Sequence, residues 1–269
     1  MIDNNESQTP SDSTAIPSAE PPATSPAPAG PVSGDGALDR LIGIFSAPGA
    51  TFERIVARPS WALPFFLLVV AVGAAGFSVF SRVDDREMEQ SLRKTMAEQA
   101  ANLPSEQIDR IIPFQIKMMK ITQTYGSIAS ISIYALIGVL FYWAIFRAFG
   151  ANATFGQTFS VFIWGSVPMA LKALIAIPVS LMRESIAFSE SMTVVRANAS
   201  FLVDPSSGGS KFLYGFLVAL DLFAIWVLVL RLSGMRKLPG VSKNLATTVA
   251  VIAFVIYVLM AANNASKMV

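Results

Sequence analysis

Two residue types with wide catalytic use are missing from this chain of 269 residues, which has no cysteine and no histidine. Without cysteine there can be no disulfide, thiolate nucleophile or thiolate metal site. Without histidine there is no imidazole base of the kind used by serine and cysteine hydrolases, and the commonest transition-metal ligand is lost. We therefore expect no catalytic residues, no cofactor and no metal site, and we predict that the protein is not an enzyme.

Charge is also scarce. Only 14% of the residues are charged, and the 20 basic and 18 acidic side chains nearly cancel, leaving a net charge of +2. This balance gives no reason to expect nucleic acid as a partner. Hydrophobic residues make up 53% of the chain, which is too apolar for an ordinary soluble protein of this length. The composition indicates a polytopic membrane protein with membrane lipids among its partners.

Five apolar runs predict membrane-spanning helices, so the fold class is all-α, a helix bundle within a membrane domain of residues 61–265. The predicted spans cover residues of about 61–80, 126–148, 158–182, 211–233 and 245–262. Residues 81–125 form a polar helical connection, in which two surface helices should be broken near Pro113. A tight polar turn around residues 150–157 would make the second and third spans antiparallel.

The fourth span contains an acidic residue, which constrains how the other spans can be arranged around it. Residues 211–231, KFLYGFLVALDLFAIWVLVLR, include nineteen residues between two cations, of which only Asp221 is charged. At ~1.5 Å per residue the run covers roughly 30 Å, the thickness of a bilayer core. A carboxylate near its middle costs about 2.5 to 3.5 kcal/mol on insertion scales. Asp221 therefore needs a polar partner or a water-filled cavity.

The third span supplies a candidate partner. It contains Lys172, and Pro168 and Pro178 should interrupt its hydrogen bonds and kink the helix. In the predicted bundle Lys172 and Asp221 lie at the same depth to within about one turn, so we expect an intramembrane polar pair. The alternative is that Lys172 extends to an interface and Asp221 stays protonated, bonded to a carbonyl that a proline has freed.

The chain before the first span falls into two parts. Residues 1–36 are rich in Pro, Ser and Ala, carry acidic residues but no Lys or Arg, and are predicted to be a disordered tail. Residues 37–60 form short amphipathic pieces that we expect to lie at the membrane interface. Six residues are predicted to contact the interface or a partner: Arg40, Phe45, Phe52, Arg54, Arg58 and Trp61. The alternative is a short helix packed against the membrane domain.

The orientation follows from the loop after the fourth span. The segment RLSGMRKLPGVSK contains Arg231, Arg236, Lys237 and Lys243 and no acidic residue. Short loops rich in Lys and Arg stay in the cytoplasm. With five spans, the N-terminus is then cytoplasmic and the C-terminus extracytoplasmic.

Several segments in this order resemble bacterial members of the Yip family, the Ypt/Rab-interacting membrane proteins. The resemblance covers roughly residues 37–263 and is carried by IFSAPGATFERI, RPSWALPFFLL, FGQTFSVFIWGSVPMAL and VALDLFAIWVLVL. It implies a five-span bundle with a cytosolic N-terminus, here in a bacterial inner membrane. Eukaryotic members bind prenylated small GTPases. The Asp-Leu-Tyr-Gly-Pro signature of that branch is absent before the first span, which counts against GTPase binding here.

Two functional hypotheses follow. The first is a non-enzymatic integral membrane protein that binds or organises partner membrane proteins or lipids, using the tail and the interfacial helices as its contact surface. The alternative is a transporter or permease subunit with a polar midplane site around Lys172 and Asp221. The five predicted spans show no internal repeat, which favours the first hypothesis.

Overall fold

The computed structural model describes residues 1, 36–99, 105–203 and 209–268. The chain divides into two units, Met1–Gly34 and Asp35–Val269, and the described helices all belong to the second. Nearly all of the predicted tail lies outside the described residues. The described residues form α-helices and two short 3₁₀ helices, and their only β-type pairing is an isolated bridge between Val83 and Ile186. The all-α prediction is therefore confirmed.

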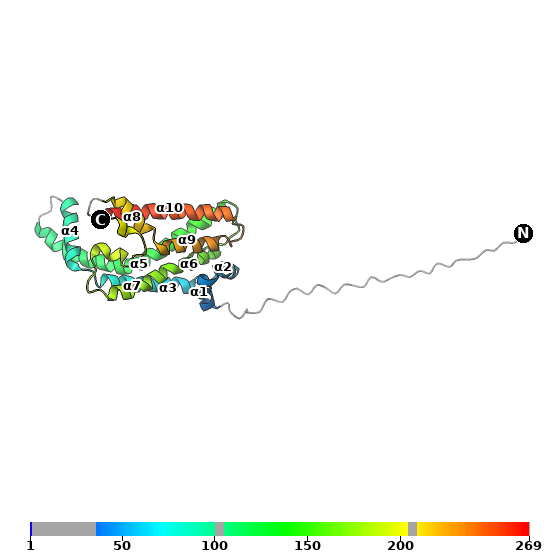
Figure 1. Cartoon of the computed structure of the whole chain (residues 1–269), viewed down its shortest axis with the longest axis horizontal. Coiled ribbons are helices and arrows are strands. Elements are labelled where there is room, and N and C mark those ends of the chain that lie inside the picture. The colour runs from blue at the N-terminus through cyan, green and yellow to red at the C-terminus, as the bar shows by residue number, and fades with distance from the viewer. Residues whose placement is uncertain (2–35, 100–104, 204–208, 269) are drawn as a thin grey trace. The chain divides into compact units, whose positions relative to one another are not determined.

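The helices follow one another closely along the chain (Figure 1). Their bounds are α1 (Ala37–Ser46), α2 (Pro48–Ala57), α3 (Ala62–Phe80), α4 (Asp85–Gln99), α5 (Ser105–Ala148), α6 (Phe155–Trp164), α7 (Val167–Leu181), η1 (Phe188–Thr193), η2 (Ser200–Leu202), α8 (Lys211–Ala219), α9 (Leu222–Met235) and α10 (Lys243–Met268).

Four of these units are long and apolar enough to cross a membrane: α3, α5, the α6–α7 unit and α10. The pair α8 and α9 makes a fifth span if it is counted as one broken helix, bent by 49°. The predicted fourth span is thus corrected, since it is not one helix over residues 211–233. It breaks at Asp221, whose carboxylate accepts a hydrogen bond from Phe223 N at 2.8 Å. A helix start offers free N–H groups and a helix interior does not.

The polar connection before the second span is also corrected. Residues 105–148 form a single helix of 44 residues, with Pro113 inside it and no break. At ~1.5 Å per residue α5 is roughly 66 Å long, about twice the thickness of a bilayer core. Two ion pairs on either side of Pro113 hold α4 against this part of α5, Arg93 with Asp109 at 2.7 Å and Lys120 with Asp85. The hydrogen bonds that Arg93 makes to Asp109 and Glu89 raise the pKa of its guanidinium.

The third span is broken between α6 and α7, but not by its prolines. The chain turns at Gly165 and Ser166, and Pro168 then lies in the first turn of α7. At that position the missing N–H costs little, because first-turn N–H groups have no partner within the helix. Pro178 lies inside α7 without ending it. The predicted kink at Pro168 is therefore replaced by a helix start.

The loops between spans gather at two opposite ends of the bundle. At one end Asn152 N donates to Pro239 O at 3.1 Å, and Lys237 forms an ion pair with Glu53 of α2 at 2.6 Å. At the other end the bridge between Val83 and Ile186 joins the chain before α4 to the loop after α7. Figure 1 shows α1 and α2 at the first end, and α4 with the C-terminal end of α10 at the second.

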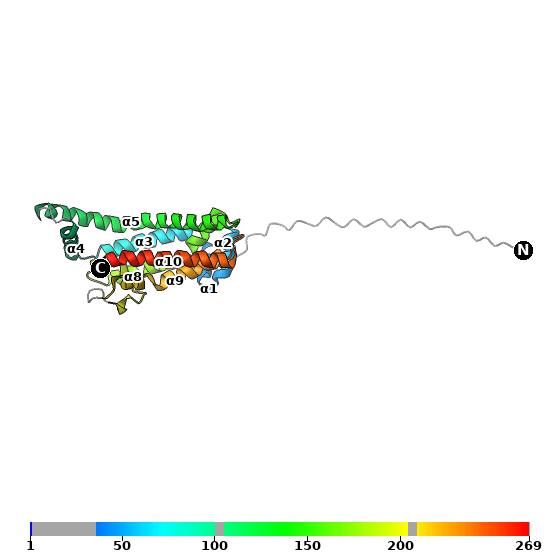
Figure 2. The same cartoon turned by 90° about the horizontal axis from the view of Figure 1, so that it is seen from above.

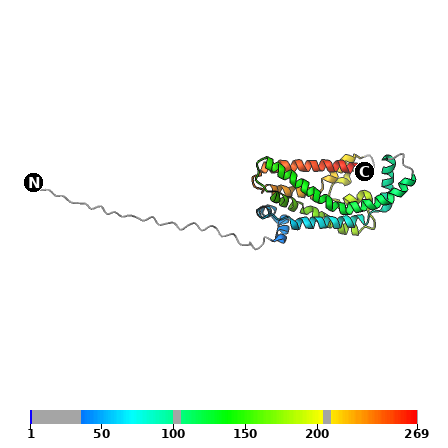
Figure 3. The ribbon, with the colours of Figure 1, turned by 180° about the vertical axis from the view of Figure 1, so that it is seen from behind.

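The spans are packed unevenly. The main core lies between α2, α5, α6, α9 and the first half of α10. A second contact, between α3 and α7, uses small residues such as Ala71, Ala75, Ala170 and Ala173, which let two helices approach closely. Helix α5 lies along one face of the bundle (Figure 2) and crosses that face obliquely (Figure 3).

Candidate functional site

Lys172 and Asp221 are brought together at the break in the fourth span. Lys172 Nζ donates to Asp221 Oδ2 at 2.8 Å, while Asp221 Oδ1 accepts from Phe223 N. The side chain of Asp221 is 4% exposed and that of Lys172 is 27% exposed. Both carboxylate oxygens therefore have a donor, and the buried charge has an opposite charge beside it. The contact ties α7 to the point where α8 ends and α9 begins.

The recess beside Lys172 contains few polar groups among the described residues. Lys172 borders a recess of about 220 Å³ between α3, α5 and α7, whose other polar lining side chains are Gln123, Ser127 and Ser191. Lys172 is the only ionisable residue among the described residues that line it. A proton or ion path needs successive polar or charged groups, and the described lining of this recess supplies only one charged residue. The arrangement is therefore that of a structural ion pair between α7 and the break between α8 and α9.

Arg231 is the residue that sequence reasoning placed wrongly. We expected it to open the basic loop, but α9 continues to Met235 and Arg231 is only 8% exposed. Its Nη2 donates to Ser166 Oγ at 2.8 Å, and its Nη1 donates to Tyr134 Oη at 3.4 Å. The guanidinium carbon lies 3.6 Å from the centre of the Phe162 ring. These partners come from three other helical segments far away in the sequence, so no local pattern predicted them.

The protein leaves room for Arg231, and no anion lies beside it among the residues that the structure describes. At Gly165 an added Cβ would lie 2.6 Å from Arg231 Cγ, so the missing side chain makes space for the arginine. Within the described part of the chain, no carboxylate forms an ion pair with Arg231, and its Nε has no hydrogen-bond acceptor. A buried guanidinium therefore meets only hydroxyl groups and an aromatic face.

Arg231 lies at the wall of a second cavity, a groove of about 490 Å³. Its lining is mainly apolar and comes from α5, α9 and α10, with single residues from α6 and α7. At its rim Ile137 of α5 and Ile256 and Met260 of α10 are exposed. These three lie within spans, so the groove opens sideways between α5 and α10, toward the lipid.

The six predicted interface residues separate into buried and exposed ones. Arg40 is buried and donates to Arg58 O at 2.9 Å and Ser60 Oγ at 2.5 Å. Phe52 is fully buried in the main core. Neither can reach lipid headgroups, so for these two the prediction is corrected. Burial of Phe52 agrees with the alternative that this segment packs against the membrane domain.

The remaining four lie nearer the surface. Arg54 Nη2 donates to Thr51 Oγ1 at 3.3 Å, and Arg58 is exposed. Trp61 is partly exposed and meets Phe159 edge to face. Phe45 shares the outer face of α1 with two further exposed apolar residues, Leu38 and Ile42. An interfacial role therefore remains a prediction for this outer face of α1, at positions i, i+4 and i+7.

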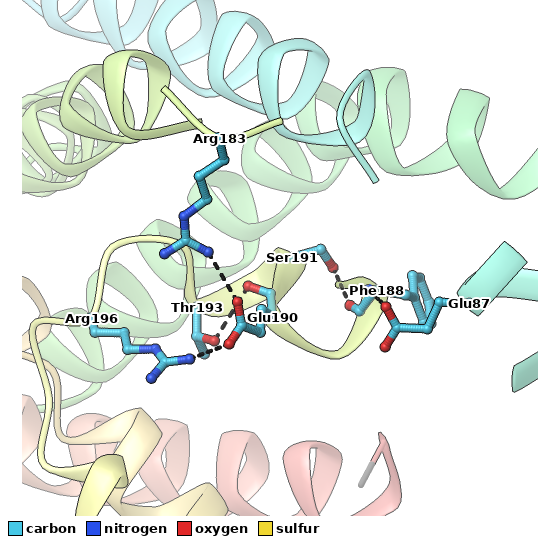
Figure 4. Close-up of polar contacts among 7 residues, drawn as sticks. All are labelled: Glu87, Arg183, Phe188, Glu190, Ser191, Thr193 and Arg196. Atoms are coloured by element: carbon cyan, nitrogen blue, oxygen red, sulfur yellow. Dashed lines mark hydrogen bonds and ion pairs between the residues drawn. The ribbon is translucent and has the colours of Figure 1, made fainter. Parts of the chain in front are cut away.

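A further polar cluster orders the loop between α7 and α8 (Figure 4). Glu190 of η1 forms ion pairs with Arg183 at 3.0 Å and with Arg196. Glu87 of α4 accepts a hydrogen bond from Phe188 N at 3.0 Å. These charges are mutually satisfied, which is the pattern of a structural contact between a loop and a surface helix.

Comparison with known proteins agrees with the resemblance seen in the sequence. The chain is 27% identical over 222 residues to the membrane protein YknW of Bacillus subtilis, an alignment that covers 81% of this chain and 87% of that protein. No solved structure matches. A family model for the Yip1 domain matches residues 42–263. With residues 42–263 matched, the chain belongs to the Yip1-domain family of membrane proteins.

Proposed function

We propose that this chain is a non-enzymatic integral membrane protein that binds and organises other membrane components, proteins or lipids, from the side, within the bilayer. The observation that carries the proposal is the unequal burial of the spans. In its most apolar window the α6–α7 unit is 67% buried inside the protein, whereas α5 is 17% buried and α10 is 28% buried.

The two least buried single-helix spans also border the groove. Helices α5 and α10 are the two least covered of the single-helix spans, and the groove of about 490 Å³ opens between them. A component approaching this groove arrives through the acyl region and not through water. The transporter alternative lacks such support, because the pairing of Lys172 with Asp221 leaves no unpaired charge at the proposed midplane site.

Photo-crosslinking in intact membranes tests the proposal. A photoreactive residue at Ile137 or Met260, on the rim of the groove, should give discrete adducts with a protein or with particular lipids. The matched control is Leu174, an exposed apolar residue of α7 that lies away from the groove. Identical labelling at all three positions, reflecting only bulk lipid, would contradict the proposal.

A further inference from the structure

We infer that the groove between α5 and α10 binds one lipid with an anionic headgroup, and that Arg231 holds this headgroup. The inference rests on the lateral binding proposed above and names its ligand. It comes from three properties of the groove: an uncompensated buried cation, a mainly apolar lining, and a size that suits a lipid chain.

The charge is the first property. Arg231 is more than nine-tenths buried, and both of its hydrogen-bond acceptors, Ser166 Oγ and Tyr134 Oη, are neutral. A buried cation is costly unless an anion lies beside it, and in this bundle Lys172 has such an anion in Asp221. Arg231 has none among the described residues. A phosphate or carboxylate in the groove would supply the missing negative charge.

The lining is the second property. Apart from Arg231 and Asn264, the groove wall is built from apolar and aromatic side chains, including Phe141, Phe254 and Tyr257. Inorganic phosphate could bind the arginine, but it would leave the apolar lining of the groove without a ligand. A lipid satisfies both parts at once, because one end of the molecule is charged and the rest is apolar.

The size is the third property. Along α10 the groove runs from Ala250 to Asn264, about 21 Å at ~1.5 Å per residue. The groove has a volume of about 490 Å³ along this length. A long, mainly apolar groove of this kind suits an extended acyl chain lying along α10.

Native mass spectrometry of the full-length protein in mild detergent tests the inference. The probes are phosphatidylglycerol and phosphatidylcholine with the same acyl chains. We expect one phosphatidylglycerol to stay bound per chain, with a preference of about tenfold over phosphatidylcholine. Arg231→Gln should abolish this preference. The matched control Arg236→Gln removes an equal charge from the end of the same helix, outside the groove, and should preserve it.

A second variant keeps the experiment decisive if Arg231→Gln does not fold. Ala253→Phe leaves Arg231 in place and fills the groove, so it should lower the binding of both lipids. Phosphatidylglycerol should also raise the melting temperature of the wild type, whereas inorganic phosphate should not.

Four results would overturn the inference: no headgroup preference in the wild type, equal losses in Arg231→Gln and Arg236→Gln, undiminished binding to Ala253→Phe, or equal stabilisation by inorganic phosphate. Discrete protein adducts at Ile137 without a preference for phosphatidylglycerol would refute the lipid site and leave the proposed lateral binding standing.

Discussion

Asp221 uses its two carboxylate oxygens for different purposes, so its replacement should be more damaging than that of Lys172. One oxygen accepts from Lys172 and the other caps the first turn of α9. We expect Asp221→Ala to lower the unfolding free energy by about 3 to 5 kcal/mol for the broken pair and by about 1 kcal/mol for the lost cap. Lys172→Ala should cost less, because the cap remains. Unfolding of the detergent-solubilised protein measures both changes.

Two further variants separate the pair from the cap. Asp221→Asn keeps a capping oxygen and loses the charge, so its stability should lie between those of the wild type and Asp221→Ala. The exchange of Lys172→Asp with Asp221→Lys should recover only part of the loss, because lysine cannot accept from Phe223 N. If the single variants are silent, or if their effects simply add, the contact contributes no coupling energy.

Gly165 should be intolerant of a side chain because Arg231 occupies the space beside it. An alanine Cβ there would lie 2.6 Å from Arg231 Cγ and 3.2 Å from Arg231 Cα. Since neither atom is the flexible end of the arginine, Gly165→Ala should destabilise the protein by about 1 to 3 kcal/mol.

The matched control is Gly156→Ala in α6, where nothing lies within 4 Å of the new Cβ. That change should be neutral or stabilising by up to about 1 kcal/mol. Thermal unfolding in detergent compares the two variants. Equal effects would mean that the close approach of α9 to Gly165 does not constrain the bundle.

Helix α5 contains a proline where a helix interior normally excludes one. Pro113 cannot donate to the carbonyl of Asp109, and its ring crowds that carbonyl. Pro113→Ala should therefore strengthen the part of α5 that packs on α4. Hydrogen exchange of the amides near residues 109–117 should slow by up to about 100-fold, equivalent to about 3 kcal/mol.

Pro48→Ala provides the control for this prediction. Pro48 is the first residue of α2, where an N–H would have no partner within the helix. Its replacement should leave the exchange of α2 within about threefold of the wild type. A similar response at the two prolines would indicate that residues around Pro113 are not held in the regular helix seen here.

The elements differ in how far the sequence could predict them. The spans were predictable because about twenty consecutive apolar residues are a strong signal. The break in the fourth span was not, because no Gly or Pro marks it, and only the N-cap role of Asp221 explains it. The burial of Arg231 could not be predicted either, since its ring and hydroxyl partners come from α5, α6 and the N-cap of α7. Lys172 and Asp221, which form an ion pair at 2.8 Å, could be matched from the sequence because comparing positions along two helices needs only the helix rise.

At the scale of the whole molecule, the two ends of the bundle can be assigned to the two sides of a membrane. The ion pair between Lys237 and Glu53 places the basic loop and α2 at one end. Without Arg231, this loop still contains Arg236 and Lys237 and no acid, so we expect it to be cytoplasmic. A reporter active only in the periplasm should be silent when fused after Lys243 and active after Val269. The reverse pattern would invert the orientation.

The packing of Phe52 against Gly234 sets an order of events during synthesis. An added Cβ at Gly234 would lie 2.6 Å from Phe52, so α2 completes its contacts only when α9 is present. Roughly 180 residues separate the two, and a ribosome working at about 5 to 20 residues per second takes about 10 to 40 s to add them. The first helices to be translated are thus among the last to reach their final place, and until then their apolar faces must be sheltered by lipid or by a chaperone.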